Sequence, residues 1–474
     1  MPMMARRCRP GAFEAMIKNP KNPALFLFFA TAVLSVLLEG TAAAQKMFSP
    51  KLDLESAVSK AIESDPEIRS SQTLSKISKE RIREARTGWE PTVQISQSFT
   101  RSNNPAFVFS SLLEQGRFTG ANFSSNSLNQ PDPLNNFRTS VSVRMPVFDQ
   151  WQARSRSNRS TIEQHRAELQ VEAVSQKVRF NVIKTYCGAI LADELLKATD
   201  AAVRSAKENS RKTQDFVEVG MVAESDSLVA SVELADVEQQ KLEAQGAVVT
   251  TRAALNIAIG EKPEMLYELV GELQEKYFPE KAVSELVRIA LEQRPDYQQA
   301  RLAVDDSHEQ TRSIRNRKLP SLDAFANLGY SSPDILKGSS DYTAGLALSY
   351  TVFDPGRKSR IEQSVLSEGV AASEKDRLKN QITLEVITAD QNYQTARGKI
   401  RVSIRSVIQA EEALRILQDR YRSAVSTFDS VLRAESALLR AKHELLKAKY
   451  EYYVSYAAIL LATGGLTDAS VFDH

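Results

Sequence analysis

Side chains that could do chemistry are present in this chain of 474 residues, but their spacing does not form a catalytic site. The histidines are scattered, and no HExxH, GxSxG or glycine-rich phosphate loop occurs. The acidic residues are interspersed with basic ones, which is typical of solvated helix faces. We therefore expect no enzyme, no cofactor and no metal site. The histidines are His165, His308, His443 and His474.

Charge, cysteine content and composition limit the partners and the fold that the chain could have. Lysine and arginine together number 61 against 59 acidic residues, so no basic field is available for a nucleic acid partner. Cys187 stands alone in a helical stretch and Cys8 lies near the N-terminus, so no intramolecular disulfide is expected. Ala, Ser, Gln, Glu, Lys, Arg and Leu crowd the long central stretches, which predicts a mainly α-helical fold.

Residues 1–44 are typical of a secretory signal peptide. A basic segment precedes an apolar run at residues 24–38, and small residues end the segment at Ala44. The apolar run is shorter than the roughly 20 residues that a membrane-spanning helix needs. Cleavage is therefore expected between Ala44 and Gln45. No cysteine follows this position, so no N-terminal lipid anchor is expected.

The remaining sequence contains an internal repeat of two copies. An amphipathic helix at residues 52–69 has a counterpart at 282–298, and each contains a proline preceded by a charged residue. A second proline follows 25 residues later in both copies, at Pro91 and at Pro320. Such a repeat is sought first because it decides the fold. We expect a first structural repeat over 45–275 and a second over 276–474.

Each repeat contains two segments in which apolar and polar residues alternate, the pattern of a strand with one apolar face. The expected strands cover about 91–109, 137–148, 321–330 and 342–353. Each is near the ten residues with which a tilted strand crosses a bilayer. The polar linkers at 101–136 and 331–340 are expected to be exposed loops. The aromatic residues of the longer linker could fold over a pore mouth or pack on one another; they are Phe107, Phe109, Phe118 and Phe123.

Long helical hairpins follow the strands, at about 153–259 and 357–463, with turns near 219–226 and 423–430. Some 65 helical residues reach about 100 Å. The returning helix of the second hairpin carries apolar residues at spacings of three and four, which predicts a coiled-coil seam. The seam positions are Val431, Ala434, Leu438, Ala441, Leu445, Ala448, Tyr452, Ser455 and Ile459.

Four strands cannot close a barrel by themselves, because about eight is the working minimum and open edges in lipid leave backbone groups unpaired. The chain must therefore oligomerise. Two copies would supply eight strands, which is too narrow for a channel, whereas three would supply twelve, which can leave an aqueous lumen. The strand count alone leaves two or four copies open.

In its order of motifs, the chain resembles the TolC outer-membrane efflux family. The segments that carry the resemblance are residues 61–69, 290–298, 146–149, 220–234, 421–438 and 460–464, together with the turns at Pro91 and Pro320. The resemblance implies a mainly α fold with a small β part: two tandem repeats, each two strands and a helical hairpin. Three copies would form a 12-stranded β-barrel in the outer membrane and an α-helical barrel in the periplasm.

The resemblance also implies a function. The chain would be a passive export duct of a tripartite efflux or type I secretion system, opened by a periplasmic adaptor protein and an inner-membrane RND or ABC-type pump. The alternative is a periplasmic coiled-coil adaptor or scaffold, which would share the hairpins but would not need four strands of membrane length. The cargo stays open among drugs, metal ions, polysaccharides and polypeptides.

In the family, hydrogen bonds and salt bridges between the two turns close the periplasmic end. Asp226 and Tyr421 match members of that network, and Asp429 matches an acidic ring facing the lumen. Asp226 has an alternative interpretation as a helix N-cap. The chain departs from the family at Ala424, where glycine is usual, and at Ser426, where a basic residue is usual. The turn residues expected to contact the adaptor are Gly220, Met221, Ala424 and Val425.

Overall fold

The computed structural model describes residues 50–273, 278–334, 337–423 and 425–468, which form two compact units. The smaller unit contains strand β1 (Lys51–Leu52), paired in parallel with β4 (Glu268–Leu269). The larger unit contains the sheet and the long helices described below. The expected cleavage site at Ala44 and Gln45, the turn residue Ala424 and the expected repeat boundary at 275–276 lie outside the described residues.

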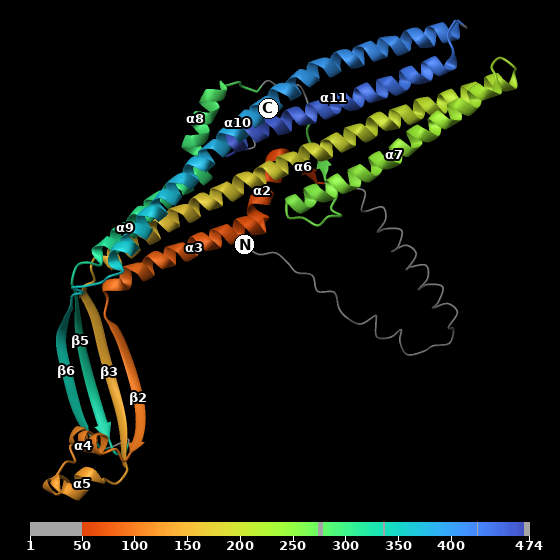
Figure 1. Cartoon of the computed structure of the whole chain (residues 1–474). Helices are drawn as coiled ribbons and strands as arrows, with labels where there is room; N and C mark the ends of the chain where they lie inside the picture. The colour runs from red at the N-terminus through yellow and green to blue at the C-terminus, as the bar shows by residue number, and fades with distance from the viewer. Residues whose placement is uncertain (1–49, 274–277, 335–336, 424, 469–474) are drawn as a thin grey trace, which may run out of the picture. The chain divides into compact units, whose positions relative to one another are not determined.

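Two long helical hairpins dominate the larger unit (Figure 1). The first consists of α6 (Gln152–Glu218) and α7 (Glu224–Ala258), and the second of α10 (Arg357–Arg422) and α11 (Phe428–Thr463). Helix α11 also packs along α6 and contacts α7. With 67 residues, α6 is about 100 Å long. The prediction of a mainly α-helical fold with a small β part is confirmed.

Within the described ranges, no helix combines the length and the apolar character that a bilayer-spanning helix requires.

Each repeat begins with a helix pair broken at a proline: α2 (Leu54–Ser64) with α3 (Pro66–Arg86), and α8 (Val283–Gln293) with α9 (Pro295–Asn316). Proline at the first helical position starts a helix without loss of a hydrogen bond. The returning helices end close to these breaks, at Gly260 and Gly464, with φ of +77° and +76°. A Cβ on Gly260 would lie 2.6 Å from the Ser64 Cβ, and one on Gly464 3.0 Å from the Arg294 Cα. The same junction therefore occurs in both repeats.

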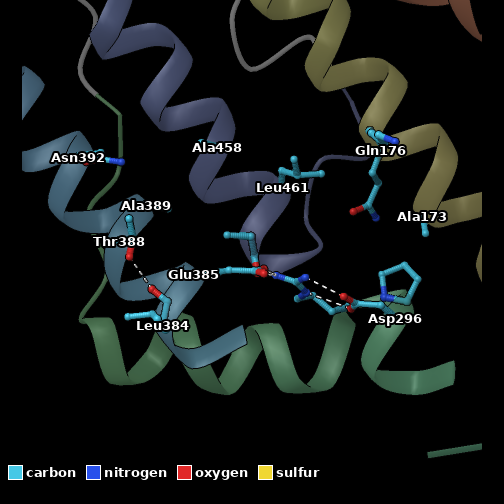
Figure 2. Close-up of a pocket in the computed structure, with 14 residues that line it drawn as sticks. Ala173, Gln176, Asp296, Leu384, Glu385, Thr388, Ala389, Asn392, Ala458 and Leu461 are labelled. Carbon is cyan, nitrogen blue, oxygen red and sulfur yellow. Dashed lines mark hydrogen bonds and ion pairs between the residues drawn. The ribbon is translucent and has the colours of Figure 1, made fainter. Parts of the chain in front are cut away.

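The junction of the second repeat is held by a half-buried arginine. Arg294 donates to Asp296 and to Glu385 at 2.7 Å each, and Gln176 of α6 donates to the Gly464 carbonyl at 2.9 Å. Figure 2 shows Gln176, Asp296 and Glu385 at this place, around a cavity of about 590 Å³ lined by α6, α9, α10 and α11. These contacts join the end of α11 to the helix pair that opens its own repeat.

The sheet is antiparallel, with strand order β2 (Thr92–Ser102), β3 (Leu134–Phe148), β5 (Ser321–Ser332) and β6 (Ser339–Ser349). Its registers align the apolar rows of all four strands on one face: Val141 lies between Ile95 and Leu328, and Leu328 opposite Tyr342. The other face carries serine, threonine, asparagine and charged residues. The two faces therefore differ sharply in polarity.

Two expected strand boundaries are wrong. The strand expected over 91–109 ends at Ser102, because Pro105 opens helix α4 (Pro105–Glu114) and the Asn104 side chain caps it by accepting from the Phe107 amide at 3.2 Å. The strand expected over 342–353 ends at Ser349 instead. Its ladder partner β5 begins only at Ser321, directly after a proline that has no N–H to donate.

The long linker between β2 and β3 is compact. After α4 it forms a 3₁₀ turn (Gly120–Phe123) and α5 (Ser125–Asn129). Phe109, Phe118 and Phe123 pack edge to face, with centroid separations of 4.9, 5.1 and 6.4 Å. Three of the four aromatic residues thus pack on one another.

Candidate gate at the helical turns

The turn between α6 and α7 is built around a glycine. Gly220 has φ +73°, a conformation that L side chains rarely adopt. Its amide donates to the Val217 carbonyl at 2.9 Å, and the Met221 amide to the Phe216 carbonyl at 2.8 Å, which satisfies carbonyls that the helix end leaves free. This geometry leaves Val219 and Met221 exposed, by 68% and 71%. The first turn therefore presents apolar side chains.

The turn between α10 and α11 closes in a related way. The Val425 amide donates to the Arg420 carbonyl at 2.8 Å, five residues back, as Met221 does in the first turn. Val425 is 64% exposed. Arg422 forms an ion pair with Asp419 at 3.5 Å. A charged pair therefore lies at the second turn, where the first turn has apolar residues.

The two hairpins meet just behind their turns in a small apolar cluster. It consists of Ala230 of α7 with Phe428 and Leu432 of α11, all buried, and Tyr421 of α10 packs against it. The rings of Tyr421 and Phe428 lie 5.5 Å apart between centroids. This cluster, called the turn cluster below, connects three of the four long helices.

Asp226 lies near Tyr421 but is not a helix cap. The N-cap of α7 is Ala223, and Asp226 is the third residue of the helix, with its amide donating to the Ala223 carbonyl at 3.0 Å. The N-cap interpretation is therefore wrong. Burial, and then the charge of Asp226, raise the pKa of Tyr421. Within the part of the chain that the structure describes, no hydrogen bond joins their side chains.

Asp429, the residue matched to an acidic ring, is exposed in the first turn of α11 and carries a basic partner. Arg433 donates to its carboxylate through Nε at 2.8 Å and Nη2 at 2.5 Å. This charge-assisted pair holds the pKa of Arg433 above its usual value. The arginine balances the charge of Asp429 within one protomer.

A carboxylate that the sequence patterns did not indicate lies about one helical turn beyond Leu432 of the turn cluster. The Asn209 Nδ2 of α6 donates to both carboxylate oxygens of Glu435 of α11, at 2.9 and 2.8 Å, and the Ser205 hydroxyl donates to Oε1 at 3.2 Å. Burial raises the pKa of Glu435, against the effect of these hydrogen bonds, and the charge of Glu233 raises it further. On α7, Glu233 accepts from the Ser436 hydroxyl at 2.6 Å.

These polar contacts tie the first hairpin to the second beside a cavity of about 220 Å³. Glu435 directly follows the predicted seam residue Ala434. A charged residue at the flank of a seam normally faces solvent, so the heptad pattern assigned it no contact.

Comparison with known proteins identifies the family that shares these features. The family profile described as outer membrane efflux protein matches residues 57–261 and 286–465. The outer membrane protein TolC of Escherichia coli is 22% identical over 441 residues, which covers 85% of this chain and 80% of TolC. The alkaline protease secretion protein AprF of Pseudomonas aeruginosa is 24% identical, but the match spans only 46% of either chain.

Solved structures share the fold. The CmeC outer membrane channel of Campylobacter jejuni superposes with a TM-score of 0.74 at 21% identity, covering 88% of this chain and 86% of CmeC. The expected resemblance is thereby confirmed, and the alternative of a periplasmic adaptor or scaffold is set aside. Because the family profile matches most of both repeats, this outer-membrane protein belongs to the outer membrane efflux protein family.

Proposed function

We propose that three copies of this chain form the outer-membrane duct of a tripartite efflux or type I secretion system. The strands would close a 12-stranded barrel, and the hairpins would form a tunnel through the periplasm. The cargo would move passively, since the chain itself carries no catalytic motif.

The observation that carries the proposal is the sheet. In the described residues β2 and β6 each pair on one side only, so two edges offer unpaired backbone groups. One face exposes a broad set of apolar side chains, which costs nothing in lipid but about 25 cal/mol for each Å² left in water. Free edges in lipid cost several kcal/mol per group, so copies must pair edge to edge. The exposed residues are Val93, Ile95, Phe99, Leu328, Tyr342, Leu346 and Leu348.

A periplasmic adaptor would bind at the helical turns, and an inner-membrane RND or ABC-type pump would supply the energy. The exposed Met221, next to Gly220, and the exposed Val425 offer a small apolar surface at the end of each hairpin. Apolar groups surrounded by polar ones are typical of protein contact sites.

The closed state would depend on contacts between the turns. The charge of Asp226 is close enough to raise the pKa of Tyr421, and Tyr421 packs against the turn cluster. In that state the Tyr421 phenol would donate to the Asp226 carboxylate, a bond of about 1.5 to 3 kcal/mol because the acceptor is charged. Asp429 would face the lumen.

Two measurements test the proposal. Mature protein, beginning at Gln45, should fractionate with the outer membrane and have the mass of a trimer in detergent; an intact chain in the inner membrane contradicts it. In planar bilayers, Asp226→Ala combined with Tyr421→Phe should raise the open probability, because Phe keeps the ring contact with Phe428 but removes the hydroxyl. Channels that stay closed in this double variant place the gate elsewhere.

A further inference from the structure

Helix α4 is not a free surface loop but lies on one face of the sheet. Directly paired residues share a face, so the registers Arg138 with Ser331, Ser331 with Ser339, and Gly329 with Asp341 place these residues together on the polar face. Glu114, Gln115 and Gly116, at the end of α4, contact side chains of this face: Arg138, Asn136, Ser331 and Ser339. In Figure 1, α4 lies at the end of the sheet away from the long helices.

An arginine on the polar face holds the helix down. Arg138 donates through Nη1 to Glu114 at the end of α4, at 2.9 Å, and to the Ser331 hydroxyl at 2.9 Å. Its Nη2 donates to Asp341 of β6 at 3.2 Å. One guanidinium therefore bridges a carboxylate of the loop and a carboxylate of the sheet, a geometry to which its fork of donors is suited.

A second contact reinforces this arginine clamp. The Gln115 amide nitrogen donates to the Asn135 carbonyl at 2.8 Å and to the Asn136 side chain at 3.0 Å. Gln115 and Asn136 are only 3% and 6% exposed, and Ser331 beneath them is fully buried. These buried hydrogen bonds fix the end of α4 against β3, because moving it away would leave buried polar atoms without partners.

Gly329 leaves room on the sheet for the ion pair between Arg138 and Asp341, because it has no side chain. A Cβ on Gly329 would lie 2.5 Å from an Asp341 carboxylate oxygen and 2.8 Å from the Arg138 Nη2. Any larger residue would therefore push the ion pair off the sheet.

From this geometry we infer that residues 103–133 form a cap inside the outer mouth of the duct, held by Arg138 and limiting the size of the solute that passes. The inference rests on the proposed function: the apolar face of the sheet meets lipid, so the polar face lines the lumen, and α4 lies on that face. Strand β2 enters the loop at its end away from the periplasmic helices, which is the external end. Three caps would narrow the mouth.

The test measures access to the lumen from outside. Ser142 pairs with Gln94 and Asn327 on the polar face, four residues deeper than Arg138 or roughly 13 Å along the strand. Intact cells carrying Ser142→Cys are treated with a small membrane-impermeant maleimide and with a large polyethylene glycol maleimide. Background is low because burial raises the pKa of the native Cys187 thiol to about 12.

The small reagent should label Ser142→Cys readily and the large one slowly. Replacing residues 103–133 by Asn-Gly, a two-residue hairpin turn, should raise labelling by the large reagent roughly tenfold or more, since the capped state is then removed. Arg138→Gln should raise it about two- to fivefold, because this partly exposed clamp is only one of the contacts. Arg144→Gln, on the same face but away from α4, is the matched control and should change nothing.

Two outcomes separate the inference from the proposed function. Equal labelling by the large reagent with and without residues 103–133 overturns the cap while leaving the duct intact. Val143→Cys lies on the apolar face and should resist both reagents. If Val143→Cys labels as fast as Ser142→Cys, the sheet does not separate lipid from lumen, and the proposed function itself fails.

Discussion

The two helical turns occupy equivalent places in the repeats but present different chemistry. The first exposes Val219 and Met221 around a glycine in the left-handed conformation. The second carries the ion pairs Arg422–Asp419 and Arg433–Asp429 on either side of Val425. Both turns expose an apolar residue at the equivalent position, Met221 and Val425. They differ in what flanks it: the exposed Val219 in the first turn and the two ion pairs in the second.

The shared turn cluster keeps the two unlike turns together, and breaking it should have the largest effect. Phe428 is 5% exposed, so Phe428→Ala should lower the free energy of unfolding by about 3 to 5 kcal/mol through lost burial and a cavity. Val425→Ala, in the exposed part of the same turn, should change it by less than about 0.5 kcal/mol. Denaturant unfolding of the purified protein measures both, and equal effects would show that the cluster does not connect the hairpins.

The glycine of the first turn should matter next. Gly220→Ala has free space for a Cβ but must keep φ at +73°, so it should cost about 1 to 2 kcal/mol. Gly246→Ala, in the exposed interior of α7, should instead stabilise by about 0.5 to 1 kcal/mol, because alanine favours helix. Thermal unfolding compares them. A neutral Gly220→Ala would mean that the turn adopts another conformation in solution.

The polar tie between the hairpins should depend on pH. The pKa of Glu435 is raised in the folded protein, so the folded state binds the proton more tightly than the unfolded state. Stability should then be greatest below the ordinary glutamate range and fall as pH rises through the raised value. Glu435→Gln should flatten this part of the stability curve and keep the contacts to Asn209. An unchanged pH profile would show that Glu435 is not the titrating group.

The charged second turn should have the smallest effect, on ion block alone. Three Asp429 carboxylates near an axis would attract divalent cations, but each is paired with Arg433. Asp429→Ala should weaken block of the conductance by Mg²⁺, and Arg433→Ala should strengthen it by releasing the carboxylate. Bilayer recordings at several Mg²⁺ concentrations measure the block in both variants. If the block changes in the same direction in both, Asp429 does not face the lumen.

The sequence alone determined the repeat, the long hairpins and the family, because each depends on local patterns. Proline at Pro66 and Pro295 starts a helix wherever it stands at the first position, and glycine at Gly220 permits a left-handed turn. Spacings of three and four predict a helix without knowledge of its partner. The end of β2 at Ser102, which was predicted wrongly, also depends on local sequence. Asn104 and Pro105 form a helix start, and the alternation of apolar and polar residues obscured it.

Only the tertiary structure decided which distant side chains meet. The Arg138 clamp depends on the registers of three strands and on a loop that folds back, and the contacts of Glu435 depend on how α11 lies against α6. Asp226 could be assigned to the first turn of α7, and not to its N-cap, only once the structure placed Ala223 at the cap. Periodicity states which face of an element is buried; it carries no information about the rotation and register at which two faces meet, and these contacts depend on both.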